Sequence, residues 1–461
     1  MESINIENTS VNEEKVKGIR GQIITFTSDP FLNEPKSCYK HYIDGLIVIK
    51  NGIIIDVDNY DTIKNKYNID NIEHYENALI TPGFVDCHVH YVQSPMIGSF
   101  GDTLLEWLEQ YTFPTEAKYN DKEFAKSVAN IFFKEILAQG TTTANVFCTT
   151  FEESVDAFFE ESERYNTRMI AGKVLQDRNL PENLKDKSAI ESIIISEKLL
   201  NKWHKKGRQL YSIIPRFAPT STEEQLTLAG DLYQKYIDND VYLHTHLNEA
   251  EEEIDWVKDL FPDCKNYTDV YKKFRMVDKR SIMAHCCIMK EDEWSSLHRA
   301  DCGVAHCPSS NLFLGDGIFK YHEAKSIKRP VRTGIGTDVG AGTNFSVVRQ
   351  LNEAYKVAML NKRNLSAIHS LYLATRGGAE VLHLEDKIGS IAKGYEADIA
   401  ILDLKASEFI EWRLEFTQDI FEKLFILFTI SPQNMNRATF VAGKKVYDKY
   451  RDNKFMYSSE L

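Results

Sequence analysis

The sequence predicts an α/β protein with a (β/α)8 TIM-like barrel and a small β-sandwich domain formed by both chain ends. Short apolar runs alternate with amphipathic segments through the middle of the chain, which is typical of a barrel. Both flanks instead consist of strand-like runs separated by turn residues. We therefore predict a barrel over residues 81–385, with residues 1–80 and 386–461 as the two parts of the β-sandwich domain.

Eight apolar runs are the predicted barrel strands: residues 83–90, 141–147, 168–176, 210–217, 241–246, 281–285, 302–307 and 331–338. Between them lie stretches such as DKEFAKSVANIFFKEILAQG, where apolar residues recur at intervals of three and four and a glycine closes the end. This alternation favours a parallel sheet closed into a barrel. In such barrels, catalytic side chains stand at the C-terminal ends of the strands.

The segments on either side of the predicted barrel are expected to form the second domain jointly. GQIITFTSDP and GLIVIKNGIIIDVDNY precede residue 80, and ADIAILDL and ATFVAGKKVYDKY follow residue 385. Each flank has too few strands for a stable sheet of its own. We therefore expect the two ends of the chain to pair.

Composition limits the partners and the compartment. With 55 Lys and Arg against 68 Asp and Glu, the 461-residue chain has a formal net charge of −13, so it lacks the basic footprint that binding to nucleic acid requires. The polar start has no apolar signal region, and KLFILFTI is too short to span a bilayer. The eight cysteines have no C-x-x-C spacing and indicate reduced thiols. These features predict a cytoplasmic protein that binds neither nucleic acid nor membrane.

The stretch DCHVHY places His88 and His90 at the end of the first predicted strand. Alternate side chains of a strand share a face, so both can reach one metal ion. An isolated H-x-H is more often coincidence. Here, however, His246, His285 and Asp338 end the fifth, sixth and eighth predicted strands. Imidazole and carboxylate suit a catalytic zinc ion and also suit iron.

Several neighbouring residues have alternative interpretations. His244 shares a face with His246, and a core histidine is at least as good an interpretation of it. The acidic run EAEEEID, which begins at Glu249, favours a solvated helix start after that residue. His306 either shapes a loop over the site or acts in it. CGVAHC lacks the four-ligand spacing of a structural zinc site.

The motifs resemble a known superfamily. PGFVDCHVH, HTH, MAHC, AHCPSSN and GTDVGAG, in this order, are similar to the amidohydrolase superfamily. Within it, QSPMIGSFGDTLLEWLEQYTFPTEAKY, PRFAPTST, HTHLNE and KNYTDVYKKF resemble the guanine deaminase family over nearly the whole chain. Departures fall at Cys87, Val92 and His244, positions that vary in the family. None of them is an implied ligand.

The resemblance implies roles for individual residues. One zinc ion per subunit, with iron as the alternative, would be held by His88, His90, His246 and Asp338. The purine would be bound by Gln93, Arg216, Phe217 and His246. Glu249 would protonate ring nitrogen N3 and help protonate the departing amine, His285 would orient the attacking water, and Asp338 would accept the proton of that water.

The reaction implied is hydrolytic deamination of guanine to xanthine and ammonia, by a homodimer. Guanine should be preferred to adenine, because an adenine-like edge would leave buried polar groups unpaired. The alternatives are another aminohydrolase of the superfamily, acting on a pterin, a triazine or another purine, and a catalytically silent scaffold, which should have lost ligands. Arg216 and Phe217 stand where a two-metal relative would carry a bridging lysine, so one metal is favoured. A salt bridge closing the fourth strand is the other interpretation of Arg216.

Overall fold

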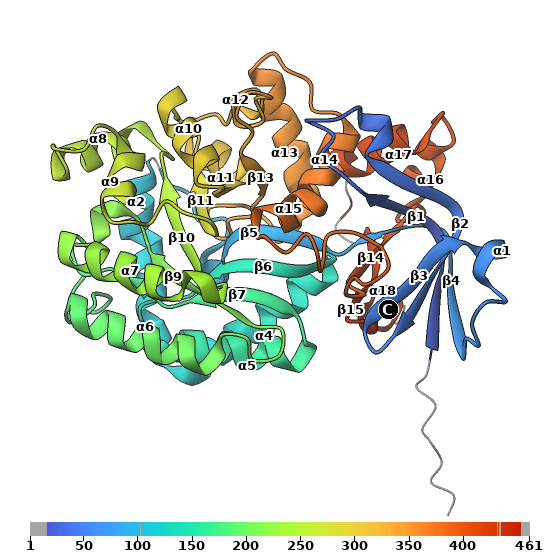
Figure 1. Cartoon of the computed structure of the whole chain (residues 1–461), viewed down its shortest axis with the longest axis horizontal. Helices are drawn as coiled ribbons and strands as arrows, with labels where there is room; N and C mark the ends of the chain where they lie inside the picture. Colours follow the sequence, from blue (N-terminus) through green and yellow to red (C-terminus); the bar gives the residue numbers. More distant parts are fainter. Residues whose placement is uncertain (1–15, 102, 431, 433–434, 453–461) are drawn as a thin grey trace, which may run out of the picture.

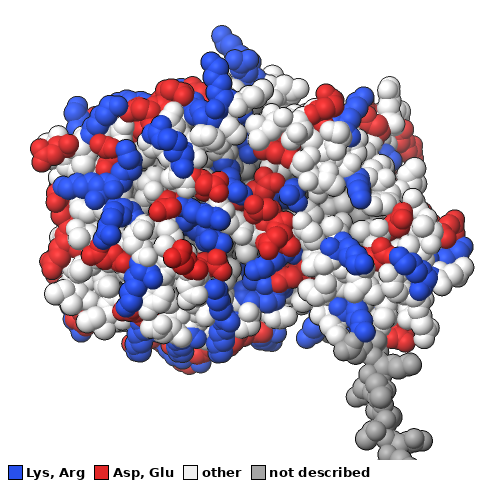
Figure 2. Space-filling view, viewed as in Figure 1, with Lys and Arg blue, Asp and Glu red and all other residues white. Residues whose placement is uncertain are grey.

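The computed structural model describes residues 16–101, 103–430, 432 and 435–452; the first fifteen residues of the predicted N-terminal part lie outside this range. Figure 1 shows a barrel of strands surrounded by helices and, beside it, a sheet built from strands near both ends of the described chain. On the face drawn in Figure 2, basic and acidic side chains are interspersed over both parts. The predicted fold class is confirmed.

Eight parallel strands form the barrel in chain order. They are β5 (Phe84–His90), β6 (Thr141–Phe147), β7 (Arg168–Gly172), β9 (Leu210–Pro215), β10 (Tyr242–Leu247), β11 (Ser281–His285), β12 (Gly303–His306) and β13 (Arg332–Ile335). The two-residue β8 (Val174–Leu175) also pairs with β9. Each predicted strand coincides with one of these eight. Just beyond β13, Asp338 N donates to His88 O (2.9 Å) and His90 N donates to Val339 O (3.0 Å), which closes the barrel against β5.

Helices follow the strands around the barrel. They are α4 (Lys122–Ala138), α5 (Glu152–Tyr165), α6 (Ala189–Trp203), α7 (Glu223–Tyr236), α8 (Glu251–Leu260), α9 (Tyr267–Lys273), α10 (Glu291–Arg299), α11 (Pro308–Leu314), α12 (Tyr321–Ala324), α13 (Val347–Leu360), α14 (Ala367–Ala374) and α15 (Arg376–Val381). The helix expected in DKEFAKSVANIFFKEILAQG is α4. The Asp121 side chain caps its first turn, and Gly140, at φ +85°, follows its end. Among the described residues, no helix has both the length and the apolar character of a bilayer span.

The connection from β5 to α4 is long and mostly helical. It contains the short helices α2 (Leu104–Trp107) and α3 (Phe113–Glu116), which a π-helical turn joins. It starts at the C-terminal end of β5, so it lies at the face of the barrel where active sites form.

The second part of the molecule is one seven-stranded sheet. Its order is β16 (Lys444–Asp448), β15 (Asn436–Val441), β14 (Ile399–Asp403), β4 (Asn71–Pro82), β1 (Val16–Phe26), β2 (Tyr39–Lys50) and β3 (Ile53–Asn59). The sheet folds over an apolar core, because the β2–β3 and β15–β16 turns meet: Ala397 N donates to Gly52 O and Gly443 N donates to Ala397 O, both at 2.8 Å. The predicted sandwich is thus built from a single folded sheet.

Strand β4 joins the two ends of the chain and was not among the predicted strands. It pairs with β1 in parallel and with β14 antiparallel. Its first half, NIEHYEN, carries polar residues and shows little apolar alternation. Its second half leads through Gly83 directly into β5. Three helices complete this side of the molecule: α16 (Glu408–Leu414), α17 (Ile420–Ile430) and α18 (Lys449–Asp452), with the short α1 (Tyr60–Ile63) after β3.

Buried ion pairs join the sheet to the barrel. Arg168 and Arg208 come from the barrel, and Glu396 and Asp398 come from the segment just before β14. Arg208 Nη1 donates to Asp398 Oδ1 (3.1 Å), and Asp398 also accepts from Ala442 N (2.8 Å). Removing one member of a buried pair leaves a charge without its partner, which is strongly destabilising.

We therefore expect Asp398→Asn to lower the free energy of unfolding by about 3 kcal/mol, because Arg208 loses one of its two carboxylates. Urea denaturation followed by circular dichroism measures this loss. The matched control is Glu152→Gln, which removes an exposed partner of Lys198 and should leave the midpoint unchanged. Equal midpoints for the two variants would show that the buried pairs do not stabilise the junction.

Candidate active site

Side chains from four strand ends converge inside the mouth of the barrel. His88 and His90 lie on β5, His246 on β10 and His285 on β11, and Asp338 follows β13. All five are buried, with at most 8% of any residue exposed. Because parallel strands place their carboxyl ends at one face, residues 250 positions apart in the chain become neighbours.

The nitrogens of His88 and His90 face each other across a short gap. Their Nε2 atoms are 3.2 Å apart, and Asp338 Oδ1 lies 3.1 Å from the first and 3.4 Å from the second. Ligand atoms held at zinc's bond lengths in tetrahedral geometry are roughly 3.4 Å apart. His246 joins the two β5 histidines in a group whose ligand atoms all lie within 4.8 Å of one another. This donor set therefore fits a small divalent cation.

Burial keeps these imidazoles neutral. It lowers the pKa of His88 to about 3, and it lowers the pKa of His90, His246 and His285 well below the usual value. A neutral imidazole retains a lone pair for a metal ion. Burial also raises the pKa of Asp338, and a divalent cation would favour its ionised form.

Hydrogen bonds outside the cluster fix its members. Arg216 O lies 2.7 Å from His246 Nδ1, so the opposite nitrogen of that ring is left for a ligand. Asp86 accepts from Thr337 N (2.9 Å), from the Thr337 hydroxyl and from His88 N (3.3 Å). Burial raises the pKa of Asp86 to about 7. Asp86 thereby ties β5 to the segment that carries Asp338.

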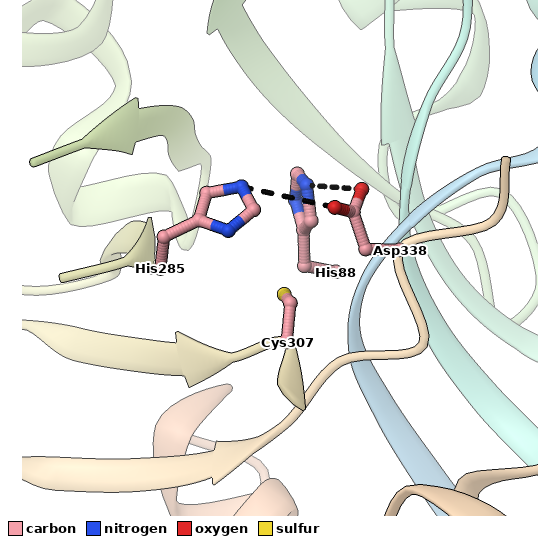
Figure 3. A group of neighbouring side chains, drawn as sticks. All are labelled: His88, His285, Cys307 and Asp338. Carbon is pink, nitrogen blue, oxygen red and sulfur yellow. Dashed lines mark ion pairs between the residues drawn. The ribbon is translucent and has the colours of Figure 1, made fainter. Parts of the chain in front are cut away.

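Cys307 is a neighbour that sequence reasoning did not assign to this cluster. Figure 3 shows its sulfur beside His88, His285 and Asp338, and their possible ligand atoms lie within 4.8 Å of one another. Burial raises the pKa of the Cys307 thiol well above its usual value, so the protonated form, a poor metal ligand, is favoured.

The other two possible metal ligands of CGVAHC, Cys302 and His306, make contacts outside this cluster. The Cys302 thiol donates to Asp278 O at 3.4 Å. His306 Nδ1 lies 2.6 Å from the Tyr321 hydroxyl, and its ring stacks on Phe319. Among the described residues, no possible ligand group combines Cys302 with His306, and the contacts of His306 are those of a packing residue.

A cavity of about 380 Å³, counting its open mouth, lies above the histidines. Its polar wall consists of His90, Gln93, Arg216, His246, Glu249 and Asp338. Its apolar wall consists of Leu104, Trp107, Leu108, Phe217 and Ala341. A wall that combines apolar side chains with fixed polar groups suits a small, flat organic molecule.

Glu116, at the end of α3, is a site residue that sequence reasoning missed. It is fully buried and accepts two bonds from Arg216 Nη1 (2.9 and 3.0 Å) and one from Gln93 Nε2 (2.9 Å). Gly340 N donates to Gln93 Oε1 (3.2 Å). The salt bridge considered for Arg216 is thus present, and Arg216 still lines the cavity. The available signal was the acid in FPTEAKY, inside the motif that supported the resemblance.

Glu249 follows β10 and faces both the cavity and His285, with 3.3 Å between Oε1 and His285 Nδ1. Burial raises its pKa well above the usual value, and the nearby carboxylates of Asp316 and Asp338 add to the effect. The protonated carboxyl is therefore favoured, as a proton donor requires.

The solvated helix start expected after Glu249 is only partly correct. Glu251 and Glu252 are exposed, but Glu253 is buried. Its carboxylate accepts from Glu249 N (2.9 Å) and from the Tyr267 hydroxyl (2.9 Å). An acid at a helix start was predicted to face water, whereas this one holds the backbone of Glu249.

Comparison with known proteins defines the class. The sequence matches the amidohydrolase family over residues 79–446, and the chain belongs to this family. Within this family, the chain is 42% identical to the guanine deaminase of Escherichia coli (strain K12), over 95% of this chain and 99% of that protein.

Solved structures agree with this similarity. The E. coli guanine deaminase structure superposes with a TM-score of 0.91, covering 94% of this chain and 99% of that one. Guanine deaminase from Bradyrhizobium japonicum gives 0.90 at 31% identity, with coverage of 94% and 99%. Guanine deaminase from C. acetobutylicum, solved with guanine bound in its active site, gives 0.84 at 26% identity, with coverage of 94% and 100%.

The donor set predicts that the purified protein binds one equivalent of a divalent cation, and that His88→Ala abolishes this binding because one of the two facing nitrogens is lost. Metal content after dialysis, measured by mass spectrometry, tests this. His306→Phe is the control, since it alters a buried strand-end histidine whose ring contacts Tyr321. A full equivalent of metal retained by His88→Ala would overturn the assignment.

Proposed function

We propose that this chain is a guanine deaminase that hydrolyses guanine to xanthine and ammonia and uses one zinc ion per subunit, with iron as the alternative. The observation that carries the proposal is the position of the buried His–Asp donor set at the floor of a cavity whose polar wall includes Gln93 and Arg216. The 42% identity to the E. coli guanine deaminase, over nearly the full length of both chains, supports the choice of substrate.

The metal would be held by His88, His90, His246 and Asp338. A zinc ion held there would bring the pKa of a water molecule in the site towards roughly 7 and so supply a nucleophile at neutral pH. His285 would orient this water. This role is supported by its Nε2, which is buried, has no hydrogen-bond partner in the described chain and lies 3.9 Å from Asp338 Oδ2. Asp338 would accept the proton that the water gives up.

Glu249 carries the protons on the substrate side. Its favoured protonated form donates to ring nitrogen N3, which makes the adjacent C2 electron-poor as the water oxygen bonds to it. The proton that Asp338 took from the water then reaches the amine with the help of Glu249, the C2–N bond breaks and ammonia leaves. The hydroxyl left at C2 gives its proton to Glu249, so that a carbonyl remains and both carboxyl groups return to their starting states. The hydrogen bond that Glu249 N donates to the Glu253 carboxylate fixes the backbone from which the Glu249 carboxyl extends.

Base recognition would be divided between an aromatic face and a polar wall. Phe217 offers its ring to the flat heterocycle, Arg216 donates towards the O6 carbonyl, and Gln93 supplies a donor and an acceptor. Glu116 holds both polar side chains through its carboxylate. Adenine has no carbonyl at this position, so it would leave buried donors unpaired, at a cost of several kcal/mol.

Two alternatives are weaker. Another ring, such as a pterin or triazine, would need a different match to Gln93 and Arg216. A silent scaffold would have no need of an intact donor set facing an open cavity. The remaining expectations, a homodimer in the cytoplasm, stay predictions; the eight cysteines, all free thiols, are consistent with a reducing compartment.

Ammonia release by the zinc-loaded protein tests the proposal directly. We expect rapid release from guanine with xanthine as the product, and release from adenine that is slower by orders of magnitude. Coupled glutamate dehydrogenase detects the ammonia, and chromatography identifies the ring product. Release from a pterin or a triazine but not from guanine would contradict the substrate while leaving the hydrolase class intact.

Glu249→Gln should lower kcat for guanine by about 10²- to 10⁴-fold, since the amide occupies the same volume but cannot deliver a proton. Metal content should stay at the wild-type value. Glu252→Gln, three residues further on and exposed, is the matched control and should be fully active. Wild-type kcat in the Glu249 variant would remove this residue from the mechanism.

A further inference from the structure

His244 lies directly behind the metal ligand His88. It is on β10, two residues before His246, and is fully buried. Its Nε2 is 2.9 Å from His88 Nδ1, and the two rings stand nearly perpendicular, with 4.8 Å between centroids. Phe147 packs against the His244 ring at 4.7 Å. This contact joins His244 to the nitrogen of His88 that faces away from the donor set, which packing alone would not require.

The proton positions follow from the donor set, and this step rests on the proposed metal. His88 offers Nε2 to the cluster, so its proton is on Nδ1 and is donated to His244 Nε2. The proton of His244 must then be on Nδ1, which is buried and has no partner among the described residues.

His88 differs from the other ligands in what holds it. The ring of His246 is fixed by a backbone carbonyl, that of Arg216. His90 Nδ1 has no hydrogen-bond partner in the described part of the chain. His88 alone of the three depends on another side chain, whose own second nitrogen is left unpaired inside the barrel. The unpaired Nδ1 of His244 costs free energy in this buried position. The hydrogen bond between His244 and His88 offsets this cost and gives a reason for a histidine at position 244.

We propose that His244 is a positioning residue for the metal site: it accepts the Nδ1 proton of His88 and thereby fixes the tautomer and ring orientation in which His88 Nε2 faces the metal. Partners of this kind to a ligand histidine typically change metal affinity 10- to 100-fold. His244 touches neither the substrate cavity nor the reacting atoms, so its effect is exerted through His88.

The test compares three variants by chelator competition with Zn²⁺ and by the visible spectrum of the Co²⁺-loaded protein. His244→Phe keeps a ring of similar size but removes the acceptor, so Zn²⁺ affinity should fall 10- to 100-fold and the Co²⁺ bands should shift. His244→Gln can place a carbonyl oxygen near the Nε2 position and should restore most of the affinity. His306→Phe, the same replacement at another buried strand-end histidine, should bind both metals as the wild type does.

Wild-type Zn²⁺ affinity and an unchanged Co²⁺ spectrum in His244→Phe would overturn the proposal. If that variant does not fold, ¹⁵N-histidine NMR of the zinc-loaded wild type decides: a proton on His244 Nδ1 supports the proposal, and one on Nε2 overturns it. Failure of the proposed function is distinguishable, because a protein that releases no ammonia from guanine can still show the dependence of Zn²⁺ affinity on residue 244.

Discussion

The closure of the barrel between β5 and the segment after β13 is the constraint on which the rest of the site depends. Two backbone bonds join His88 and His90 to residues 338 and 339, and Asp86 adds bonds to Thr337. The same contacts that complete the sheet bring Asp338 to within 3.4 Å of both histidines. The stability of the barrel and the geometry of the donor set therefore depend on the same contacts. Loss of these contacts would separate the Asp338 carboxylate from the two imidazoles.

The polar wall of the cavity depends on a different element. Glu116 lies on the helical connection between β5 and α4, whereas Arg216 follows β9. Their buried ion pair, at 2.9 Å, holds the connection against the opposite side of the barrel mouth. Gln93, bonded to Glu116 and to Gly340 N, extends this network towards the segment that follows Asp338. These contacts fix the connection as part of the site. The ion pair also neutralises the charge of Glu116, whose burial would otherwise be costly.

The barrel strands and the polar residues at their ends could be predicted from the sequence. All eight barrel strands, and the histidines and aspartate at their ends, carry their signal within a few residues of sequence. Strand β4 was missed because its polar first half lacks the apolar alternation of a strand. Glu116 was missed because its partner Arg216 is 100 positions away. Glu253 was misjudged although its partners, Glu249 N and the Tyr267 hydroxyl, are 4 and 14 positions away, because an acid in the first turn of a helix was expected to face water. The contact between His244 and His88 spans 156 positions and is likewise visible only in three dimensions.

The two sets of contacts imply a separation of tasks within one cavity. The donor set comes entirely from strand ends, whose positions are dictated by the parallel sheet and by its closure. The polar wall of the cavity comes in part from the connection after β5, which the sheet does not constrain in length or sequence. Substitutions in that connection can therefore change the heterocycle that fits while His88, His90, His246 and Asp338 stay in place. Under the proposed function, the donor set would determine the class of chemistry, and the Gln93–Glu116–Arg216 network would select the ring.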